Sequence, residues 1–154
     1  RMLEDYERQF YLPMSERYHK LIADNYKLAS EITAWKSKVT REWDNIELVS
    51  LDLPNRSKQV IALGKSYVGE VKLEIGELDM HEVGVELVIV EQKDGKTSIY
   101  EKHDFQPKSQ EGSIATYHID VTADAPGLFL LAIRIYPKNN LLPHRQDFAL
   151  VKWL

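Results

Sequence analysis

The chain has 154 residues, of which 44% are hydrophobic and 29% are charged, and its net charge is −4 at pH 7. This length suffices for one ordinary core, or for a smaller domain with an appendage. A mildly acidic chain without a basic cluster is a poor nucleic-acid binder, because such binding requires phosphate neutralisation. The absence of cysteine excludes disulfide scaffolds, thiolate zinc sites and cysteine nucleophiles.

No apolar run approaches the roughly 20 residues of a membrane span, and the N-terminus lacks the apolar region of a signal peptide. We therefore expect a soluble protein without a membrane partner. The absence of cysteine is compatible with the reducing cytoplasm, which is the expected location. The sequence begins with Arg1 inside a helical pattern, so we also expect it to be a piece of a longer polypeptide.

Residues 1–12 predict a short helix, because Leu3, Tyr6 and Phe10 recur at helical spacing. Pro13 lacks a backbone donor and disfavours helical angles in the residue before it, so a kink or break is expected there. It would form either a simple helix-turn-helix or a hinge between two docking helices. Ser15 is then the expected N-cap of the next helix.

Residues 15–44 predict one uninterrupted amphipathic helix, because apolar side chains recur on one face and no glycine occurs before Gly64. At about 1.5 Å per residue the helix is roughly 45 Å long, which is longer than a small domain is wide. Part of its apolar face should therefore dock on a larger body. The expected docking residues are Tyr18, Leu21, Ile22, Leu28, Ile32, Trp35, Val39 and Trp43.

After Asp44 the apolar period changes from 3.6 to 2, which predicts strands. The expected strands are residues 46–53, 70–75, 83–90, 98–105, 115–121, 128–136 and 148–153, with a further short apolar run at 60–63. A tight hairpin is expected at 93–96, where Asp94-Gly95 supplies positive backbone angles. Polar residues 106–112 are expected to form a loop, and residues 125–127 a turn.

Short strands separated by turns about every ten residues indicate an antiparallel β-sandwich of the immunoglobulin-like kind. Residues 128–136 are apolar on both faces and are expected to form a central, buried strand. Leu87, Leu131 and Ile133 are expected in the core. The predicted fold class is α+β by segments, with a helical part at residues 1–44 and an all-β part at 45–154.

Two kinds of ligand site can be considered on the strands. His118 with Asp120, and His103 with Asp104, suggest a metal site, but polar pairs also occur on the wet face of a half-buried strand without any ligand. Strand aromatics could stack on sugar rings, although such rings commonly pack against cross-strand neighbours. The candidate sugar-contact residues are Tyr100, Tyr117, Tyr136 and Trp153.

Catalytic motifs are lacking. The sequence has no Ser-His-Asp elbow, no phosphate-binding glycine-rich loop and no HExxH motif. We therefore assign no catalytic, cofactor-binding or metal-binding residue to the chain.

Several segments resemble the C-terminal end of bacterial α-glucan phosphorylases, of the shorter type distinct from the animal glycogen enzyme. The resemblance runs through RMLEDYERQFYLP, DNYKLASEITAWKSKVTREWDNIEL, YVGEVKLEIGELDMHEVGVELVI, PGLFLLAIRIYP and LLPHRQDFALVKWL. It is most specific in the helical AWK…W segment and in the closing pattern of Gly127, Arg134, Pro137, Leu142 and Trp153.

This resemblance implies a parent enzyme that uses pyridoxal phosphate and inorganic phosphate to release glucose 1-phosphate from α-1,4-glucans. The family's cofactor lysine lies upstream in a glycine-rich segment that nothing here matches, so no catalytic or cofactor residue carries over. Residues 1–44 would pack on the upstream catalytic lobes, and residues 45–154 would brace or assemble the enzyme. The alternatives are a carbohydrate-binding module that holds the glucan, or a general protein-interaction sandwich. A homodimer through the apolar helix face is also expected.

Overall fold

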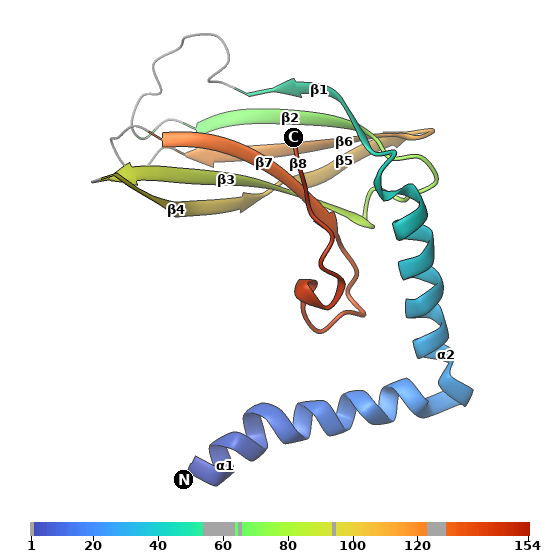
Figure 1. Ribbon diagram of the computed structural model, residues 1–154. Coiled ribbons are helices and arrows are strands. Elements are labelled where there is room, and N and C mark those ends of the chain that lie inside the picture. The colour runs from blue at the N-terminus through green and yellow to red at the C-terminus, as the bar shows by residue number, and fades with distance from the viewer. Residues whose placement is uncertain (1, 54–63, 65, 94, 123–128) are drawn as a thin grey trace. The chain divides into compact units, whose positions relative to one another are not determined.

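The structure, a computed structural model, describes residues 2–53, 64, 66–93, 95–122 and 129–154 (Figure 1). The chain divides into two compact units, Arg1–Thr40 and Arg41–Leu154. The first unit is helical and the second is built from strands. The helical elements are α1 (Met2–Tyr6), the π-helical turn η1 (Glu7–Tyr11) and α2 (Leu12–Trp43).

The expected break at Pro13 is wrong, because α2 begins at Leu12 and continues through the proline. The π-helical turn lies directly before it, and its wider register lets the Leu12 N–H donate to the Glu7 carbonyl. Pro13 thus lies within a continuous helical run, directly after the π-helical turn. Ser15 therefore lies inside the helix and is not its N-cap.

The long helix is confirmed, but it is not uninterrupted. Ala23 to Tyr26 have non-helical backbone angles, and φ is positive at Asp24 (48°), Asn25 (56°) and Tyr26 (61°). Asp and Asn tolerate this left-handed conformation better than most residues, because their short polar side chains can bond locally. The helix is therefore bent at a point where the apolar repeat in the sequence continues without a gap (Figure 1).

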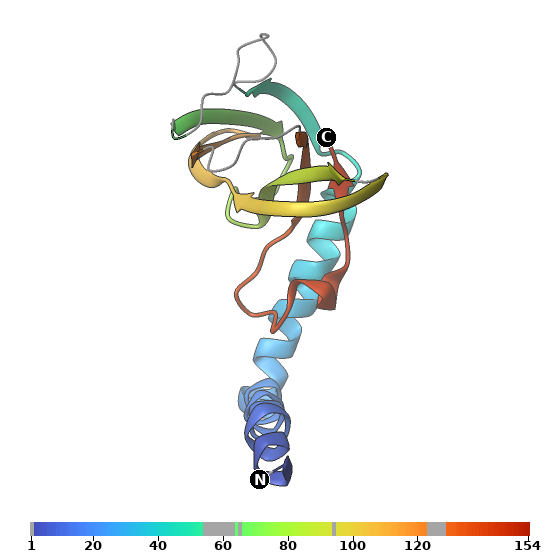
Figure 2. The same ribbon diagram turned by 90° about the vertical axis from the view of Figure 1, so that its left-hand side faces the viewer.

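The second unit is an antiparallel sandwich, as predicted. Its described strands are β1 (Glu47–Asp52), β2 (Ser66–Glu74), β3 (Val83–Lys93), β4 (Lys96–Asp104), β5 (Gln106–Glu111), β6 (Ile114–Thr122), β7 (Phe129–Pro137) and β8 (Lys152–Trp153), with a 3₁₀ turn, η3 (Arg145–Phe148), before β8. They form two four-stranded sheets with the orders β1-β2-β6-β5 and β4-β3-β7-β8. Figure 2 shows the two sheets as stacked layers.

The core of the sandwich consists of the inward-facing residues of both sheets. They are Val71, Leu73 and Ile75 from β2 and the residue after it, Val83, Val85 and Leu87 from β3, Ala115, Tyr117 and Ile119 from β6, and Ile133 and Ile135 from β7. Leu87 and Ile133 are buried as predicted, whereas Leu131 is only half-buried. The β7 strand lies between β3 and β8, but its outer face is partly open, with Leu130 51% exposed.

The connection between the sheets at residues 75–82 is fixed by side chains that come 30–37 residues later in the sequence. Gln110 donates to the Leu78 carbonyl at 3.0 Å and accepts from the Met80 N–H at 2.8 Å. The Tyr117 hydroxyl donates to the Met80 carbonyl at 3.0 Å. These three hydrogen bonds orient the loop and satisfy the polar groups that make them.

The hairpin predicted at 93–96 is confirmed, because Lys93 pairs with Lys96 and Gly95 has a φ of +71°. Two other expectations are wrong. The expected loop at 106–112 contains an edge strand, β5, and the last strand comprises only Lys152–Trp153. The apolar run at 60–63 and the turn at 125–127 lie outside the described residues.

Candidate functional site

The burial of the predicted docking residues increases along α2, from Tyr18 to Trp43. Tyr18 is 61% exposed, Leu21, Ile22 and Leu28 are half-buried, and Ile32, Trp35, Val39 and Trp43 are buried. The first turns add exposed apolar residues that the predicted set did not contain. They are Tyr6, Phe10, Tyr11, Leu12 and Met14, each more than half exposed.

Part of this exposed set forms, together with the half-buried Leu21, one stripe. Phe10, Met14, Tyr18 and Leu21 recur at spacings of four, four and three, which places them on one helix face. The ring of Tyr6 lies 5.2 Å from that of Phe10, between centroids, so the stripe extends to the start of the helical unit. We call Tyr6, Phe10, Met14, Tyr18 and Leu21 the helix stripe. Monomeric proteins seldom leave so much contiguous apolar surface in water.

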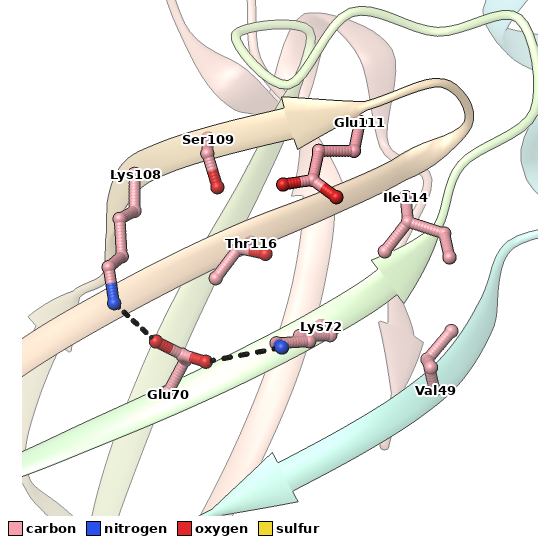
Figure 3. Close-up of a pocket in the computed structure, with 8 residues that line it drawn as sticks. All are labelled: Val49, Glu70, Lys72, Lys108, Ser109, Glu111, Ile114 and Thr116. Atoms are coloured by element: carbon pink, nitrogen blue, oxygen red, sulfur yellow. Dashed lines mark hydrogen bonds and ion pairs between the residues drawn. The ribbon is translucent and has the colours of Figure 1, made fainter.

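The sandwich has a shallow hollow on the outer face of the β1-β2-β6-β5 sheet (Figure 3). Its lining is mostly polar and charged, and comprises Val49, Glu70, Lys72, Lys108, Ser109, Glu111, Ile114 and Thr116. The Lys108 Nζ donates to Glu70 Oε2 at 2.6 Å, and Lys72 Nζ lies 3.7 Å from Glu70 Oε1. The hydrogen bond from Lys108 is the main cause that holds the pKa of Glu70 below its ordinary value.

This hollow lacks the features of a catalytic centre. The Glu70 carboxylate is held by two lysines and stays ionised at neutral pH, so it is a poor general acid. Among the residues that line the hollow, Val49 and Ile114 are aliphatic and none is aromatic. A sugar ring would therefore find hydroxyl partners there but no flat apolar surface on which to stack.

The outer face of the other sheet carries a charge network around Glu86. This glutamate is only 4% exposed, and its carboxylate accepts hydrogen bonds from Arg134 in β7 and from Arg145 in η3, the latter at 3.0 Å. Burial raises the pKa of Glu86, but the hydrogen bonds and charges of Arg145 and Arg134 outweigh it, so the pKa lies below its ordinary value. Glu86 is thus an ionised, fully paired anchor for the segment before β8.

Sequence reasoning missed this network, although a signal was present. Glu86 interrupts the apolar run VGVELVIV, and Arg134 interrupts LFLLAIRIY. Opposite charges in the middle of two apolar strands indicate a cross-strand pair, and the two residues are indeed directly opposite in the β3–β7 register. Arg145 gave no such signal, because it lies in a polar segment.

Tyr136 extends the network on the same face of β7. Its hydroxyl donates to Asp104 Oδ1 at 3.1 Å, and the Arg145 guanidinium lies 5.0 Å from its ring centroid. Burial, together with the negative charge of Asp104, raises the pKa of Tyr136 to about 12. Its ring lies on Gly84, where a Cβ atom would overlap it.

The four predicted sugar-contact residues have different environments. Tyr117 is 1% exposed and belongs to the core, so its ring offers no face to a ligand. Tyr100 is 42% exposed and its ring packs 4.9 Å from Phe129. Trp153 is 56% exposed, and the Arg134 guanidinium lies 5.6 Å from its ring centroid. Tyr136 and Trp153 lie on the outer face of the neighbouring strands β7 and β8, but the Tyr136 ring packs over Gly84 in β3, away from β8.

The two histidine–aspartate pairs lie in different sheets, with His118 and Asp120 in β6 and His103 and Asp104 in β4. His103 Nε2 is 3.1 Å from Glu101 Oε2. Among the described residues, no three His, Cys, Asp or Glu side chains gather so that they could hold a metal ion together. In the same part of the chain, no helix is long and apolar enough to span a membrane.

Comparison with known proteins shows the class of this sandwich. Residues 43–154 match the family model of the glycogen phosphorylase C-terminal domain. The chain therefore belongs to the family of glycogen phosphorylase C-terminal domains.

A curated relative extends the similarity to the helical unit. The maltodextrin phosphorylase of Thermococcus litoralis is 27% identical over 161 aligned positions, which cover 99% of this chain and 18% of the relative. The chain thus spans less than a fifth of that protein's length. The helical residues before 43 lie outside the family model but inside this second similarity.

Proposed function

We propose that this chain is the C-terminal accessory part of an α-glucan phosphorylase. In this proposal residues 1–44 dock on the upstream catalytic lobes, and residues 45–154 brace or assemble the enzyme. The parent enzyme would phosphorolyse α-1,4-glucan to glucose 1-phosphate in glycogen or starch metabolism. The family match at residues 43–154 and the relative of which the chain spans 18% support this placement.

The observation that carries the docking role is the helix stripe. Its members Tyr6, Phe10, Met14 and Tyr18 are 52–67% exposed, although each gains roughly 1.5–3 kcal/mol when fully buried. A surface of this kind is typical of an element that a larger body covers. In the proposed enzyme the catalytic lobes supply that body.

Pyridoxal phosphate belongs, in this proposal, to the upstream part of the enzyme. The cofactor of this enzyme class needs an enclosed lysine, and the three described lysines whose contacts are known do not fit. Lys72 and Lys108 pair with Glu70 on an open sheet face, and Lys152 Nζ donates to the carbonyls of Asp44 and Ile46. We accordingly infer that the chain by itself does not phosphorolyse glucan.

A truncation experiment tests the accessory role. A phosphorylase that carries this chain is compared with the same enzyme lacking residues 45–154, by cofactor absorbance, release of glucose 1-phosphate from maltodextrin, and thermal unfolding. We expect the truncated enzyme to retain the cofactor absorbance but to unfold at lower temperature or to lose its assembly state. Equal stability, assembly and activity of the two forms would overturn the bracing role.

A point substitution tests the docking role. Phe10→Glu places a charge in the helix stripe and should lower the unfolding temperature of the whole enzyme. Val68→Glu is the matched control, because Val68 is 69% exposed but lies in β2, on the sandwich. If the two substitutions have equal effects, the helix stripe does not dock on the catalytic lobes.

A further inference from the structure

The outer face of the β4-β3-β7-β8 sheet carries an apolar patch that spans three strands. Val90 in β3 pairs with Ile99 in β4 on one side and with Leu130 in β7 on the other. In the next row of the same face, Val88 pairs with Ala132. Directly opposed residues of antiparallel strands project on the same face, so these five side chains adjoin one another. We call Val88, Val90, Ile99, Leu130 and Ala132 the aliphatic patch.

The aliphatic patch faces away from the core of the sandwich. Its two β3 members lie on either side of Ile89 and share the face of Glu86, whereas Leu87 points into the core. Leu130 is 51% exposed and Ile99 is 54% exposed. Single exposed aliphatic residues are ordinary, but opposed residues on neighbouring strands form one contiguous apolar surface. Figure 1 shows the three strands that carry it side by side.

The outer face of the β1-β2-β6-β5 sheet has a different character. Among its described residues, the strand register places six carboxylates and two lysines on this face, so their net charge is −4. They are Glu47, Asp52, Glu70, Glu74, Glu111 and Asp120, with Lys72 and Lys108. We call this surface the acidic face. Its most exposed apolar side chain, Val68, stands directly opposite Asp120.

Charges beside the aliphatic patch nearly cancel. Glu86 and Asp104 are balanced by Arg134 and Arg145, and Lys102 lies opposite Val88. Apolar surface with little net charge is what a protein contact requires, whereas desolvating the acidic face would cost free energy for each unpaired carboxylate. Of the two outer faces, the one with the aliphatic patch is therefore suited to contact another protein surface.

The size of the aliphatic patch decides which partner can cover it. Three strands about 4.8 Å apart and two rows roughly 7 Å apart give a footprint on the order of 200 Å². A stable interface between free proteins buries about 800 Å² on each partner. The patch is thus too small to hold a free protein. A surface on the same polypeptide meets it at an effective concentration of about millimolar order, so that a weak contact is populated.

We propose that the aliphatic patch contacts an apolar surface of low net charge on the upstream catalytic part of the same polypeptide. This inference rests on the proposed function, in which the helix stripe already ties the chain to that part. The patch is then a second contact, which orients the sandwich and leaves the acidic face in solvent.

A photo-crosslinker tests this contact in an intact phosphorylase that carries the chain. p-Benzoylphenylalanine replaces Leu130, and in a control enzyme it replaces Val68, which is 69% exposed on the acidic face. Co-assembly of subunits with normal and heavy nitrogen separates cross-links within a chain from those between chains. We expect the probe at position 130 to cross-link to upstream residues of its own chain, and the probe at position 68 to give little product.

A charge substitution gives a second readout. Leu130→Glu should lower the unfolding temperature of the intact enzyme by about 2–4 °C, because it places a charge in a covered apolar contact. It should leave the unfolding temperature of the 154-residue chain unchanged, since Leu130 is half exposed there. Leu130→Met, which keeps an apolar side chain, should behave as wild type in both, and Val68→Glu should change neither.

Three results would overturn the contact. The first is the absence of cross-links from position 130 to upstream residues. The second is cross-links between chains, which would mean that a second copy covers the patch. The third is equal destabilisation of chain and enzyme by Leu130→Glu, which would make Leu130 a structural residue of the sandwich. If truncation destabilises the enzyme but the contact fails, the sandwich braces through another face; if truncation has no effect, the accessory role itself fails.

Discussion

Glu86 and Arg145 are 59 residues apart in the sequence, yet Arg145 Nη1 donates to Glu86 Oε1 at 3.0 Å. The bond joins the middle of β3 to η3 and holds the segment before β8 against the sheet. Arg134 binds the other oxygen of the same carboxylate. One buried carboxylate therefore joins β3, β7 and the turn before the last strand, in addition to the backbone pairing of β7 with β8.

The first prediction concerns the removal of that charge. Glu86→Gln leaves two guanidiniums without a carboxylate, and breaking a buried pair in this way costs about 3 kcal/mol of the free energy of unfolding. Urea unfolding followed by circular dichroism measures the loss. Glu70→Gln is the matched control, because Glu70 also contacts two cationic side chains but lies on an open face, and it should change stability little.

The second prediction concerns pH. The pKa of Glu86 in the folded state lies below the ordinary value of about 4.3, so its contribution is complete above that value and is lost as pH falls through the folded pKa. The stability difference between wild type and Glu86→Gln should therefore be largest at neutral pH and shrink in acid below that value. A difference that stays constant down to pH 3 would contradict the ionised state of Glu86.

The third prediction concerns Gly84. Gly84→Ala places a Cβ against the ring of Tyr136, which must move away from Asp104 and Arg145, and overpacking of this kind costs about 1–3 kcal/mol. A double-mutant cycle with Tyr136→Ala identifies the cause. The loss in free energy of unfolding caused by Gly84→Ala should largely disappear when the Tyr136 ring is absent. If the loss is the same with and without the ring, contact with Tyr136 is not its cause.

The fourth prediction concerns the kink in α2. At a residue with positive φ, glycine relieves strain, whereas inside a regular helix it costs about 1 kcal/mol relative to alanine. Tyr26→Gly should thus preserve or raise the stability of the helical unit, and Tyr26→Ala should not. Amide hydrogen exchange should be fast at residues 24–26, because left-handed residues cannot make the helical hydrogen bonds. Slow exchange there would mean a continuous helix.

The fifth prediction concerns self-association of the chain. With the helix stripe uncovered, the same face of a second copy is the simplest cover, about a two-fold axis. Sedimentation should show a homodimer that is disrupted by Leu21→Glu in the helix stripe, combined with Leu28→Glu on the predicted docking face beyond the kink. A wild-type chain that stays monomeric at high concentration would contradict this. If the wild-type chain and the double variant dimerise equally, the interface lies on the sandwich instead.

The sequence by itself determined the features that arise from local periodicity. The change of apolar period after Asp44 predicted a helix followed by strands, and Asp94-Gly95 predicted the β3–β4 hairpin, because both depend on near neighbours. The alternation in residues 70–75 likewise predicted which side chains of β2 are buried. These features need no knowledge of what the strands pair with.

Tertiary structure decided what depends on distant partners. Residues 106–111 lack an apolar alternation and form an edge strand only because the backbone of β6 supplies hydrogen bonds. Tyr117, Tyr136 and Trp153 are all aromatic residues on predicted strands. In the structure Tyr117 lies in the core, Tyr136 packs on Gly84, and Trp153 faces solvent beside Arg134. Strand pairing sets these environments, and pairing joins residues that are dozens of positions apart.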